Sequence, residues 1–534
     1  MTRLILFLTL TWVCSSSYSQ KSGASINVNH YVFEVVVNDI NDSIKCTASI
    51  YYKILKPISS ITLDLASINN GGKGMKISSV TANGQPLVFT HAGNRLTIET
   101  PGQSGELRTI KISYSGIPAD GLIISKTKYG KRSFFADNWP DRARHWLVSV
   151  DDPADKAAVE FKVTAPTHYQ VIANGVLIEE TNIDAQNKVT HWKEAIDLPT
   201  KVMAVGIADF AVNHLDSTGA IDISSWVYPE DRDKGFYDFA LAKEIIPFFE
   251  KQIAPFPFRK LANVQSKTTF GGLENAGAIF YAEQMITGER TGESTIVHEI
   301  AHQWFGDMAT ESDFSHLWLS EGFATYLTMY FMEKKYGVDS ANSLLIGDRQ
   351  EVKVFTATKL LPVVDSSVKS YMELLNPNSY QKASWVLHML RQETGDEAFW
   401  KGIQLYYKTY AGKNAVTADF QKIMETVSGK NLNQFFYQWL YVAGQPKLDI
   451  SYKYNPQKKL VTVTVVQQQP TLFVFPLELT AYGGSGTNTS RSIKLNVKDK
   501  TSSTDIPVNF EPIRIHVDEH TKLLYEGESV ARKR

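Results

Sequence analysis

Hydrophobic and polar residues alternate along the first third of the chain, in short segments that favour β-strands. Segments such as HYVFEVVVND and RTIKISYS alternate, or run β-branched and apolar, over a few residues at a time. Turn signals separate these segments, among them Asn83-Gly84 and Asn174-Gly175. The pattern predicts an all-β domain of sandwich type over residues 20–214.

The period of the hydrophobic pattern changes near residue 225. In DKGFYDFALAKEIIPFFEKQI the apolar residues recur at helical spacing, and helical patterns dominate to about Leu440. The break Gly444-Gln445-Pro446 marks a boundary, after which alternation returns in segments such as KLVTVTVVQQQ. We therefore expect a multidomain α+β protein, with a mostly helical domain over residues 215–444 and a small C-terminal β-sandwich over residues 445–534.

The first residues, MTRLILFLTLTWVCSSSYSQ, are typical of a signal peptide spanning residues 1–19. Arg3 supplies the positive charge, residues 4–13 the apolar core, and Ser19 a small residue before the cut. A lipid anchor at Cys14 is disfavoured, because the residues before it lack the small side chain expected there. No later stretch reaches 18 apolar residues, so the mature protein is expected to be exported, periplasmic or secreted, without stable membrane insertion.

The composition is that of a folded protein, and it disfavours binding to nucleic acid. A hydrophobic fraction of 43% in 534 residues supports large packed cores. Lys and Arg (55) nearly balance Asp and Glu (56), and no basic run indicates binding to nucleic acid. Nothing in the pattern indicates an oligomeric state.

The motif HEIAH, from His298 to His302, carries the candidate chemistry of the helical region. Its two histidines are four residues apart, so on a helix both imidazoles can reach one metal ion. Glu299 projects about 100° away, where it can deprotonate a water beside the ion. After a gap of eighteen residues, Glu321 in HLWLSEGFATYLTMYF offers a third ligand. This set predicts one catalytic Zn²⁺ per chain, against the alternative of a buried helix with an incidental histidine pair.

HEIAH, the eighteen-residue gap and WLSEGFATY resemble the aminopeptidase N family of gluzincin metallopeptidases, which includes the leukotriene hydrolase. GGLENAG stands where that family carries its exopeptidase motif, Gly-x-Met-Glu-Asn, and SYQKASWVL resembles the segment of its catalytic tyrosine. PDRARHWLVSVDDP and FFYQWLYVAGQPKLDI match further segments, so the resemblance covers most of the mature chain. It implies a thermolysin-like catalytic domain between two β-sandwiches, in a short, bacterial-like form without the large helical C-terminal domain of many relatives.

The same resemblance assigns roles to individual residues. It implies that His298, His302 and Glu321 bind zinc and that Glu299 is the general base. Tyr380 would donate a hydrogen bond to the oxyanion of the tetrahedral intermediate. The residues that it implies for substrate binding are Gly271, Gly272, Glu274, Asn275 and, from the first domain, Asp137.

Two positions depart from the family pattern. Leu273 replaces the methionine of the exopeptidase motif, an apolar exchange that should leave the backbone alone. Thr328 stands seven residues past the third ligand, where relatives often have a glutamate. If that glutamate orients a zinc histidine in relatives, the support of the ligands must be built differently here.

We interpret the sequence as a zinc aminopeptidase acting on peptides with a free N-terminus. A thermolysin-like endopeptidase would share the zinc helix but has no use for Glu274 as a carboxylate that holds a free amine. A catalytically silent peptide-binding protein should have lost Glu299, Tyr380 or a zinc ligand, and all of these residues are present.

Overall fold

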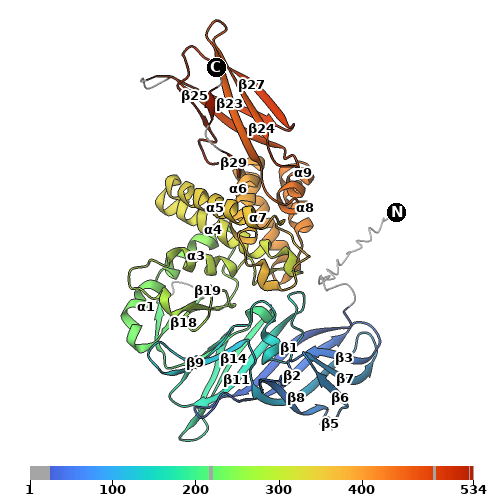
Figure 1. The fold of residues 1–534 in the computed structure, drawn as a ribbon. Helices are drawn as coiled ribbons and strands as arrows, with labels where there is room; N and C mark the ends of the chain where they lie inside the picture. Colours follow the sequence, from blue (N-terminus) through green and yellow to red (C-terminus); the bar gives the residue numbers. More distant parts are fainter. Residues whose placement is uncertain (1–23, 216–220, 485–488, 528–529, 533–534) are drawn as a thin grey trace, which may run out of the picture.

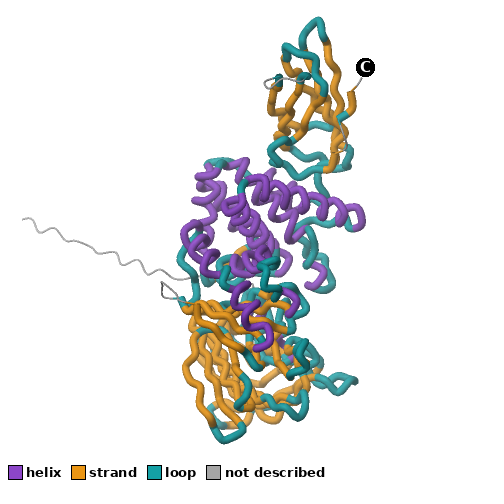
Figure 2. The backbone as a smooth tube through the Cα atoms, turned by 90° about the vertical axis from the view of Figure 1, so that its left-hand side faces the viewer, coloured by secondary structure: helices purple, strands orange, loops and turns teal. Residues whose placement is uncertain are grey.

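The computed structural model describes residues 24–215, 221–484, 489–527 and 530–532, and it places three parts end to end (Figure 1). Helices are concentrated between two strand-rich regions (Figure 2). This order confirms the predicted multidomain α+β class. The predicted signal peptide, residues 1–19, lies outside the described residues, so export stays a prediction.

The N-terminal part consists of β-sheets whose strands follow the predicted alternation. An eight-stranded sheet has the order β13-β14-β11-β1-β2-β8-β4-β5, and smaller sheets have the orders β12-β15-β10-β9 and β3-β7-β6. Buried and exposed positions alternate along β2, as expected for strands with one face on a core. The strands are β1 (Ile26–Val36), β2 (Ile44–Ile54), β3 (Ile58–Asp64), β4 (Gly74–Ala82), β5 (Gln85–Pro86), β6 (Phe89–Ala92), β7 (Arg95–Gly102), β8 (Leu107–Ile117), β9 (Leu122–Lys126), β10 (Arg132–Ala136), β11 (Lys156–Pro166), β12 (Gln170–Ala173), β13 (Val176–Asn182), β14 (Asn187–Pro199) and β15 (Val205–Ala208).

The middle part begins with a five-stranded sheet in the order β16-β17-β18-β20-β19. Its strands are β16 (Ala211–Leu215), β17 (Asp222–Val227), β18 (Lys260–Ser266), β19 (Gly272–Leu273) and β20 (Ala278–Ala282). The boundary predicted at residue 214 falls inside β16, which pairs with β17, so this sheet begins at Ala211. β19 lies at an edge of the sheet, with one side of its backbone free of strand partners among the described residues.

Helices form the rest of the middle part. The helices are α1 (Arg232–Phe239), α2 (Ala242–Gln252), α3 (Glu293–His302), α4 (Trp318–Tyr336), α5 (Val338–Thr358), α6 (Ala383–Thr394), α7 (Asp396–Tyr410), α8 (Thr417–Ser428) and α9 (Asn433–Phe436), with π-helical turns at Asn378–Lys382 and Tyr437–Tyr441 and a short pair of strands, β21 (Ala309–Glu311) and β22 (Lys413–Ala415). No helix among the described residues is both long and apolar enough to cross a membrane.

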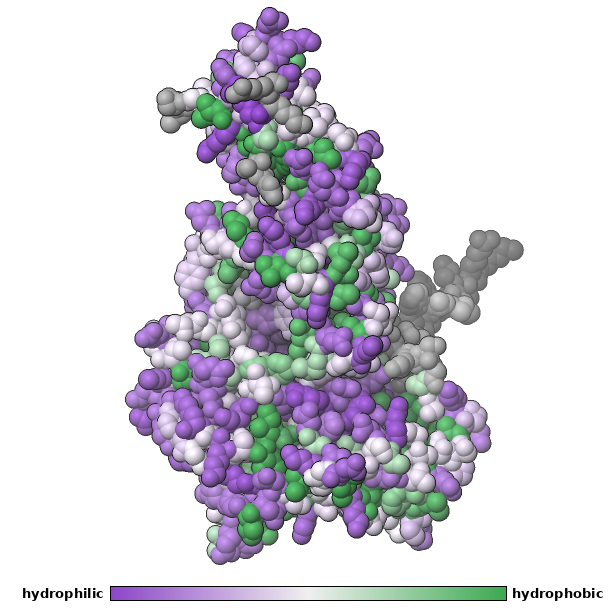
Figure 3. All heavy atoms as spheres, in the orientation of Figure 1, coloured by the Kyte–Doolittle hydropathy of each residue, from purple (hydrophilic) through white to green (hydrophobic). Residues whose placement is uncertain are grey.

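The C-terminal part contains two facing groups of strands, β27-β24-β23-β29, with β30 also paired to β23, and β26-β25-β28. Burial alternates strictly along β24, which places Val461, Val463 and Val465 in the core. On the face drawn in Figure 3, hydrophilic residues cover most of the surface and hydrophobic ones lie in small groups. The strands are β23 (Lys447–Asn455), β24 (Leu460–Gln467), β25 (Phe475–Tyr482), β26 (Ser490–Val497), β27 (Thr501–Pro507), β28 (Arg514–Val517), β29 (Glu526–Gly527) and β30 (Ala531–Arg532).

Buried polar side chains link the N-terminal and middle parts. Two of the donors are lysines that reach backbone carbonyls across the boundary, in a region where unpaired charge is costly. The hydrogen bonds run from Asn174 Nδ2 to Ala276 O (2.8 Å), from Lys260 Nζ to Ala173 O (2.8 Å) and from Lys156 Nζ to Met308 O (2.7 Å). The first of them holds the GGLENAG segment against the N-terminal part.

Candidate active site

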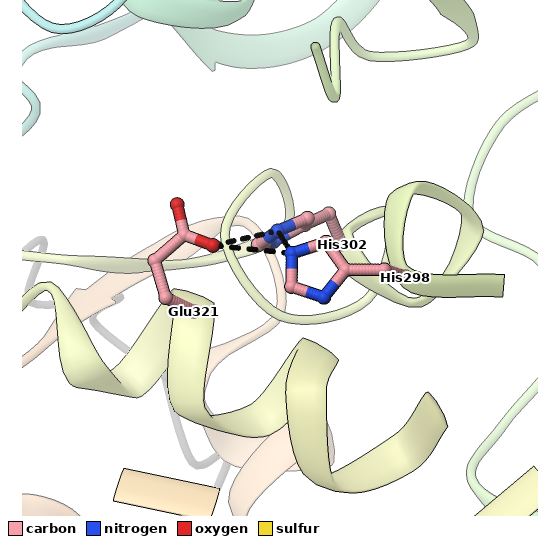
Figure 4. Close-up of side chains that lie close together, drawn as sticks. All are labelled: His298, His302 and Glu321. Atoms are coloured by element: carbon pink, nitrogen blue, oxygen red, sulfur yellow. Dashed lines mark hydrogen bonds and ion pairs between the residues drawn. The ribbon is translucent and has the colours of Figure 1, made fainter. Parts of the chain in front are cut away.

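Three predicted ligands converge where α3 meets α4 (Figure 4). His298 and His302 lie one turn apart on α3, and their Nε2 atoms are 3.0 Å from each other. Glu321, in the first turn of α4, places Oε2 3.2 Å from His298 Nε2 and 3.1 Å from His302 Nε2. These donor atoms all lie within 4.8 Å of one another, and they form the one such cluster of histidine, cysteine and acidic side chains in the described part of the chain.

Contacts at Nδ1, the ring nitrogen that does not face Glu321, hold His302 in place. Its Nδ1 lies 3.1 Å from the carbonyl oxygen of Phe305 and 3.1 Å from Ser320 Oγ. Gly306 lies against the same ring, with φ +123°, and a Cβ at this position would lie 3.0 Å from His302 Nδ1. A ring nitrogen that donates to a carbonyl leaves the opposite Nε2 lone pair free for a metal ion.

The charges of the three ligands are set mainly by burial and by one another. Burial lowers the pKa of His298, which favours the neutral imidazole that binds metals. For His302, burial would also lower the pKa, but the Glu321 carboxylate outweighs it and raises the pKa to about 10. Burial would raise the pKa of Glu321, and the two imidazoles hold it well below its usual range.

Glu299 points away from the ligands and lies against β19. A Cβ on Gly272 would collide with the Glu299 carboxylate, so the strand backbone contacts this side chain directly. Gly271 has open space beside it, since the nearest atom to a Cβ there would be Thr295 Cγ2 at 3.9 Å. Burial raises the pKa of Glu299 well above its usual value, so this carboxyl has a strong tendency to take up a proton.

The segment after β19 carries buried polar atoms without partners. Glu274 is 5% exposed and Asn275 1% exposed. Within the described chain, neither Glu274 Oε1 nor the two side-chain polar atoms of Asn275 make a hydrogen bond. Gln303, just after α3, fixes the backbone here by donating to Glu274 O (2.9 Å) and accepting from Gly277 N (2.8 Å). Buried unpaired acceptors of this kind are costly unless a ligand supplies the missing donor.

Tyr380 lies in the π-helical turn Asn378–Lys382, a kind of turn that is frequent at functional sites. Its ring stacks on the imidazole of His298, with centroids 6.0 Å apart and an interplanar angle of 18°. Burial, with the surrounding carboxylates, raises the pKa of Tyr380 well above its usual value, so the hydroxyl keeps its proton and remains a donor. Gly322 allows this segment to approach α4, because a Cβ there would lie 2.5 Å from Ala383 Cβ.

A cavity of about 410 Å³ opens onto these groups. Its walls come from β19, α3, α4, α5, the tyrosine turn and, through Trp139, the N-terminal part. Trp139 belongs to the segment between β10 and β11, which thereby reaches the cavity from the N-terminal part. Of the predicted site residues, the lining includes Gly271, Gly272, Glu274, His298, Glu299, His302, Glu321 and Tyr380.

Asp137 does not line this cavity. Its side chain is fully buried, forms an ion pair with Arg142 and accepts a hydrogen bond from Thr268 Oγ1 at 3.4 Å. The neighbouring Asn138 is also engaged internally, donating to Met203 O at 2.7 Å. The structure therefore does not bring Asp137 into the site, because its carboxylate already has a cation as partner.

Several lining residues were not predicted from the sequence. Thr325 and Thr328 lie one and two turns past Glu321 on the same face of α4, so helical spacing from the third ligand could have identified them. The Thr328 hydroxyl donates to Ala324 O (2.8 Å) and not to a ligand. The same spacing places Ser294 and Thr295 one turn before His298 on α3, and Met329 one turn after Thr325 on α4. The remaining lining residues are Trp139, Phe270, Leu344, Asp348, Leu375 and Gln381.

Comparison with known families adds two matches. A peptidase M1 N-terminal domain matches residues 27–202, and a peptidase family M1 domain matches residues 237–439. Together they span well over half of the chain. The second match contains the three candidate ligands, Glu299 and Tyr380.

Two individual relatives and one solved structure resemble this chain. The chain is 26% identical over 466 residues to probable aminopeptidase 2 of Sulfurisphaera tokodaii, covering 83% of this chain and 58% of that protein. It is 28% identical over 398 residues to tricorn protease-interacting factor F2 of Thermoplasma acidophilum, covering 70% and 49%. A crystal structure of Legionella pneumophila aminopeptidase A in complex with aspartic acid has the same fold, with a TM-score of 0.82 over 96% of this chain and 60% of that chain, at 17% identity. The chain thus spans less than two thirds of the length of each of these proteins.

Proposed function

This chain belongs to peptidase family M1, and on that premise we propose that it is a zinc-dependent aminopeptidase, which hydrolyses the first peptide bond of peptides with a free N-terminus. The observation that carries the proposal is the buried, unpartnered Glu274 carboxylate beside the His-His-Glu cluster. A free α-amine is the natural partner for such a carboxylate, and the cluster supplies the ligands for a hydrolytic metal.

The donor set fits Zn²⁺. Two imidazole nitrogens and one carboxylate oxygen converge in a buried position, with the tautomer of His302 fixed by the Phe305 carbonyl. Bound by His298, His302 and Glu321, the ion would act as a Lewis acid that polarises a carbonyl and lowers the pKa of water.

Glu299 and Tyr380 provide the proton transfer and the oxyanion contact. Glu299 takes a proton from the attacking water, as suits a carboxylate whose pKa is raised by burial, and returns it to the leaving amine. Tyr380 keeps its hydroxyl proton and donates it in a hydrogen bond to the carbonyl oxygen as charge develops there. Because its ring stacks on His298, the hydroxyl is held beside the cluster before substrate binds.

Glu274 determines which bond lies at the reacting groups. The free edge of β19 can hydrogen-bond a peptide as an added strand, and Gly272 lets that backbone lie directly against Glu299. When the α-amine of a substrate pairs with Glu274, the substrate chain stops there, and its first peptide bond is the one that lies at the cluster. An endopeptidase would instead need this end of the groove to accept a continuing chain.

The requirement for a free amine gives a direct test. We expect alanyl-nitroanilide to be hydrolysed, and its N-acetylated twin to be hydrolysed at least about a hundredfold more slowly in kcat/KM, because acetylation removes the charge that pairs with Glu274. Initial rates measured by nitroaniline release give the comparison. Equal rates for the two substrates would contradict an aminopeptidase.

Glycines of β19 and of α5 provide a matched pair of variants. Gly272→Ala should lower alanyl-nitroanilide turnover about a hundredfold, because the new methyl group displaces the Glu299 carboxylate. Gly347→Ala adds the same methyl group at an exposed position of α5, where no other atom lies within 4 Å, and should change turnover less than about threefold. Equal effects of the two variants would show that the contact with Glu299 has no role in turnover.

A further inference from the structure

One carboxylate in the cavity has no role in the chemistry above. Asp348 lies on α5, one turn after Leu344, and lines the same cavity as the metal cluster. It makes no ion pair or hydrogen bond with any other described residue. The adjacent cation, Arg349, is engaged elsewhere, since its Nη2 lies 2.8 Å from Asp518 Oδ2 in the C-terminal part.

The surroundings of Asp348 contain no compensating positive charge. Burial raises the pKa of the Asp348 carboxyl to about 7, and the nearby Glu351 raises it further in the same direction. No Lys, Arg or His of the described chain pairs with this carboxylate or contributes to the shift of its pKa. The cavity wall therefore presents an acid whose ionised form has no cationic partner in the protein.

The course of a bound peptide follows from how β19 lies along α3. Glu274 O contacts Gln303 at the end of α3, Gly272 lies against Glu299, and Gly271 faces Thr295 one turn earlier. A substrate amine at Glu274 therefore places the first residue beside the cluster. The following residues run back along β19, towards Gly271 and the first turns of α3.

Three helices line the same cavity on that side, and we refer to the part of the cavity that α3, α4 and α5 line as the side pocket. Ser294 and Thr295 of α3 form one wall, Thr325, Thr328 and Met329 of α4 a second, and Leu344 and Asp348 of α5 a third. Both threonine hydroxyls of α4 donate to carbonyls of their own helix, Thr325 to Glu321 O (2.7 Å) and Thr328 to Ala324 O (2.8 Å). Their donors are thus occupied, and Asp348 is the charged group of this side pocket.

We propose that Asp348 makes this pocket selective for a second substrate residue with a positively charged side chain, Lys or Arg. The proposal rests on the aminopeptidase function, which places the substrate amine at Glu274. A long aliphatic stem suits the walls formed by threonine methyl groups, Met329 and Leu344, and a terminal cation supplies the partner that Asp348 lacks. An uncharged side chain of the same length would leave this carboxylate without a cationic partner.

Two dipeptide amides test this selectivity. Alanyl-lysinamide and alanyl-norleucinamide differ at the second residue in its terminal charge but hardly in length. We expect the zinc-loaded protein to release alanine from the lysine substrate with a kcat/KM at least about tenfold higher, as for a hydrogen bond between charged groups. In Asp348→Asn this ratio should fall to about one. Asp339→Asn, the same exchange in the exposed first turn of α5, should keep the wild-type ratio.

Failure of this inference can be told from failure of the proposed function. Alanyl-nitroanilide carries no second residue, so its hydrolysis reports the aminopeptidase alone. If it is hydrolysed and the two amides are cleaved equally well, selectivity through Asp348 is overturned and the aminopeptidase stands. If none of the three is hydrolysed, the function fails, and calorimetric Kd values of the two amides decide: equal values overturn the inference, whereas tighter binding of the lysine amide that is lost in Asp348→Asn supports it.

Discussion

Glu299→Gln lowers the turnover of alanyl-nitroanilide about a thousandfold, the loss expected when a general base is removed, while zinc content stays near one ion per chain. The amide keeps the size of the side chain and its contact with Gly272 but cannot take a proton from water. Stopped-time nitroaniline release and metal analysis of the same sample measure both quantities.

A second glutamate on the same helix serves as the control. Glu293 lies in the first turn of α3 and pairs with Lys335 at 2.6 Å, away from the cavity. Glu293→Gln should therefore leave turnover within about twofold of the wild type, since such ion pairs contribute little. Loss of zinc from Glu299→Gln would show that Glu299 is a ligand and that the base has been assigned to the wrong residue.

Removal of the metal abolishes turnover, and zinc restores it. Because the ion binds the folded cluster, its removal should also lower Tm, on the order of 5–10 °C for a tightly bound ion. The measurements are nitroanilide rates and thermal unfolding with and without an aromatic chelator, followed by readdition of Zn²⁺. In Glu321→Gln, which loses the anionic ligand, Tm should respond much less to the chelator. Full turnover by metal-free protein would rule out the zinc mechanism.

Local periodicity was sufficient to find the metal cluster, but not the shape of the cavity around it. His298 and His302 are paired by the helical repeat itself, and Glu321 follows in a second helix whose pattern is equally clear. The close approach of Gly272 to Glu299, in contrast, is visible only in the structure.

Residues that depend on tertiary contacts could not be derived in this way. Asp137 was preferred because it stands where relatives carry a Gln or Glu near the substrate amine, but its ion pair with Arg142 is formed only in the folded chain. Asp348 is one acidic residue among many in the sequence, and only the packing of α5 beside α4 brings it to the cavity. The sequence does not show that β16 pairs with β17, because alternation looks the same in β16 as in the strands before it.

Because Trp139 lines the cavity, the site cannot form until the N-terminal part and the middle part have both been synthesised. Trp139 belongs to the N-terminal part, which leaves the ribosome first, whereas the metal ligands follow more than a hundred residues later. During synthesis, neither piece alone can enclose a substrate. The cavity is complete only when the hydrogen bonds of Lys156 and Asn174 join the N-terminal part to the middle part. The proposed hydrolysis therefore requires both parts, because a middle part without the N-terminal part would lack the Trp139 wall of the cavity.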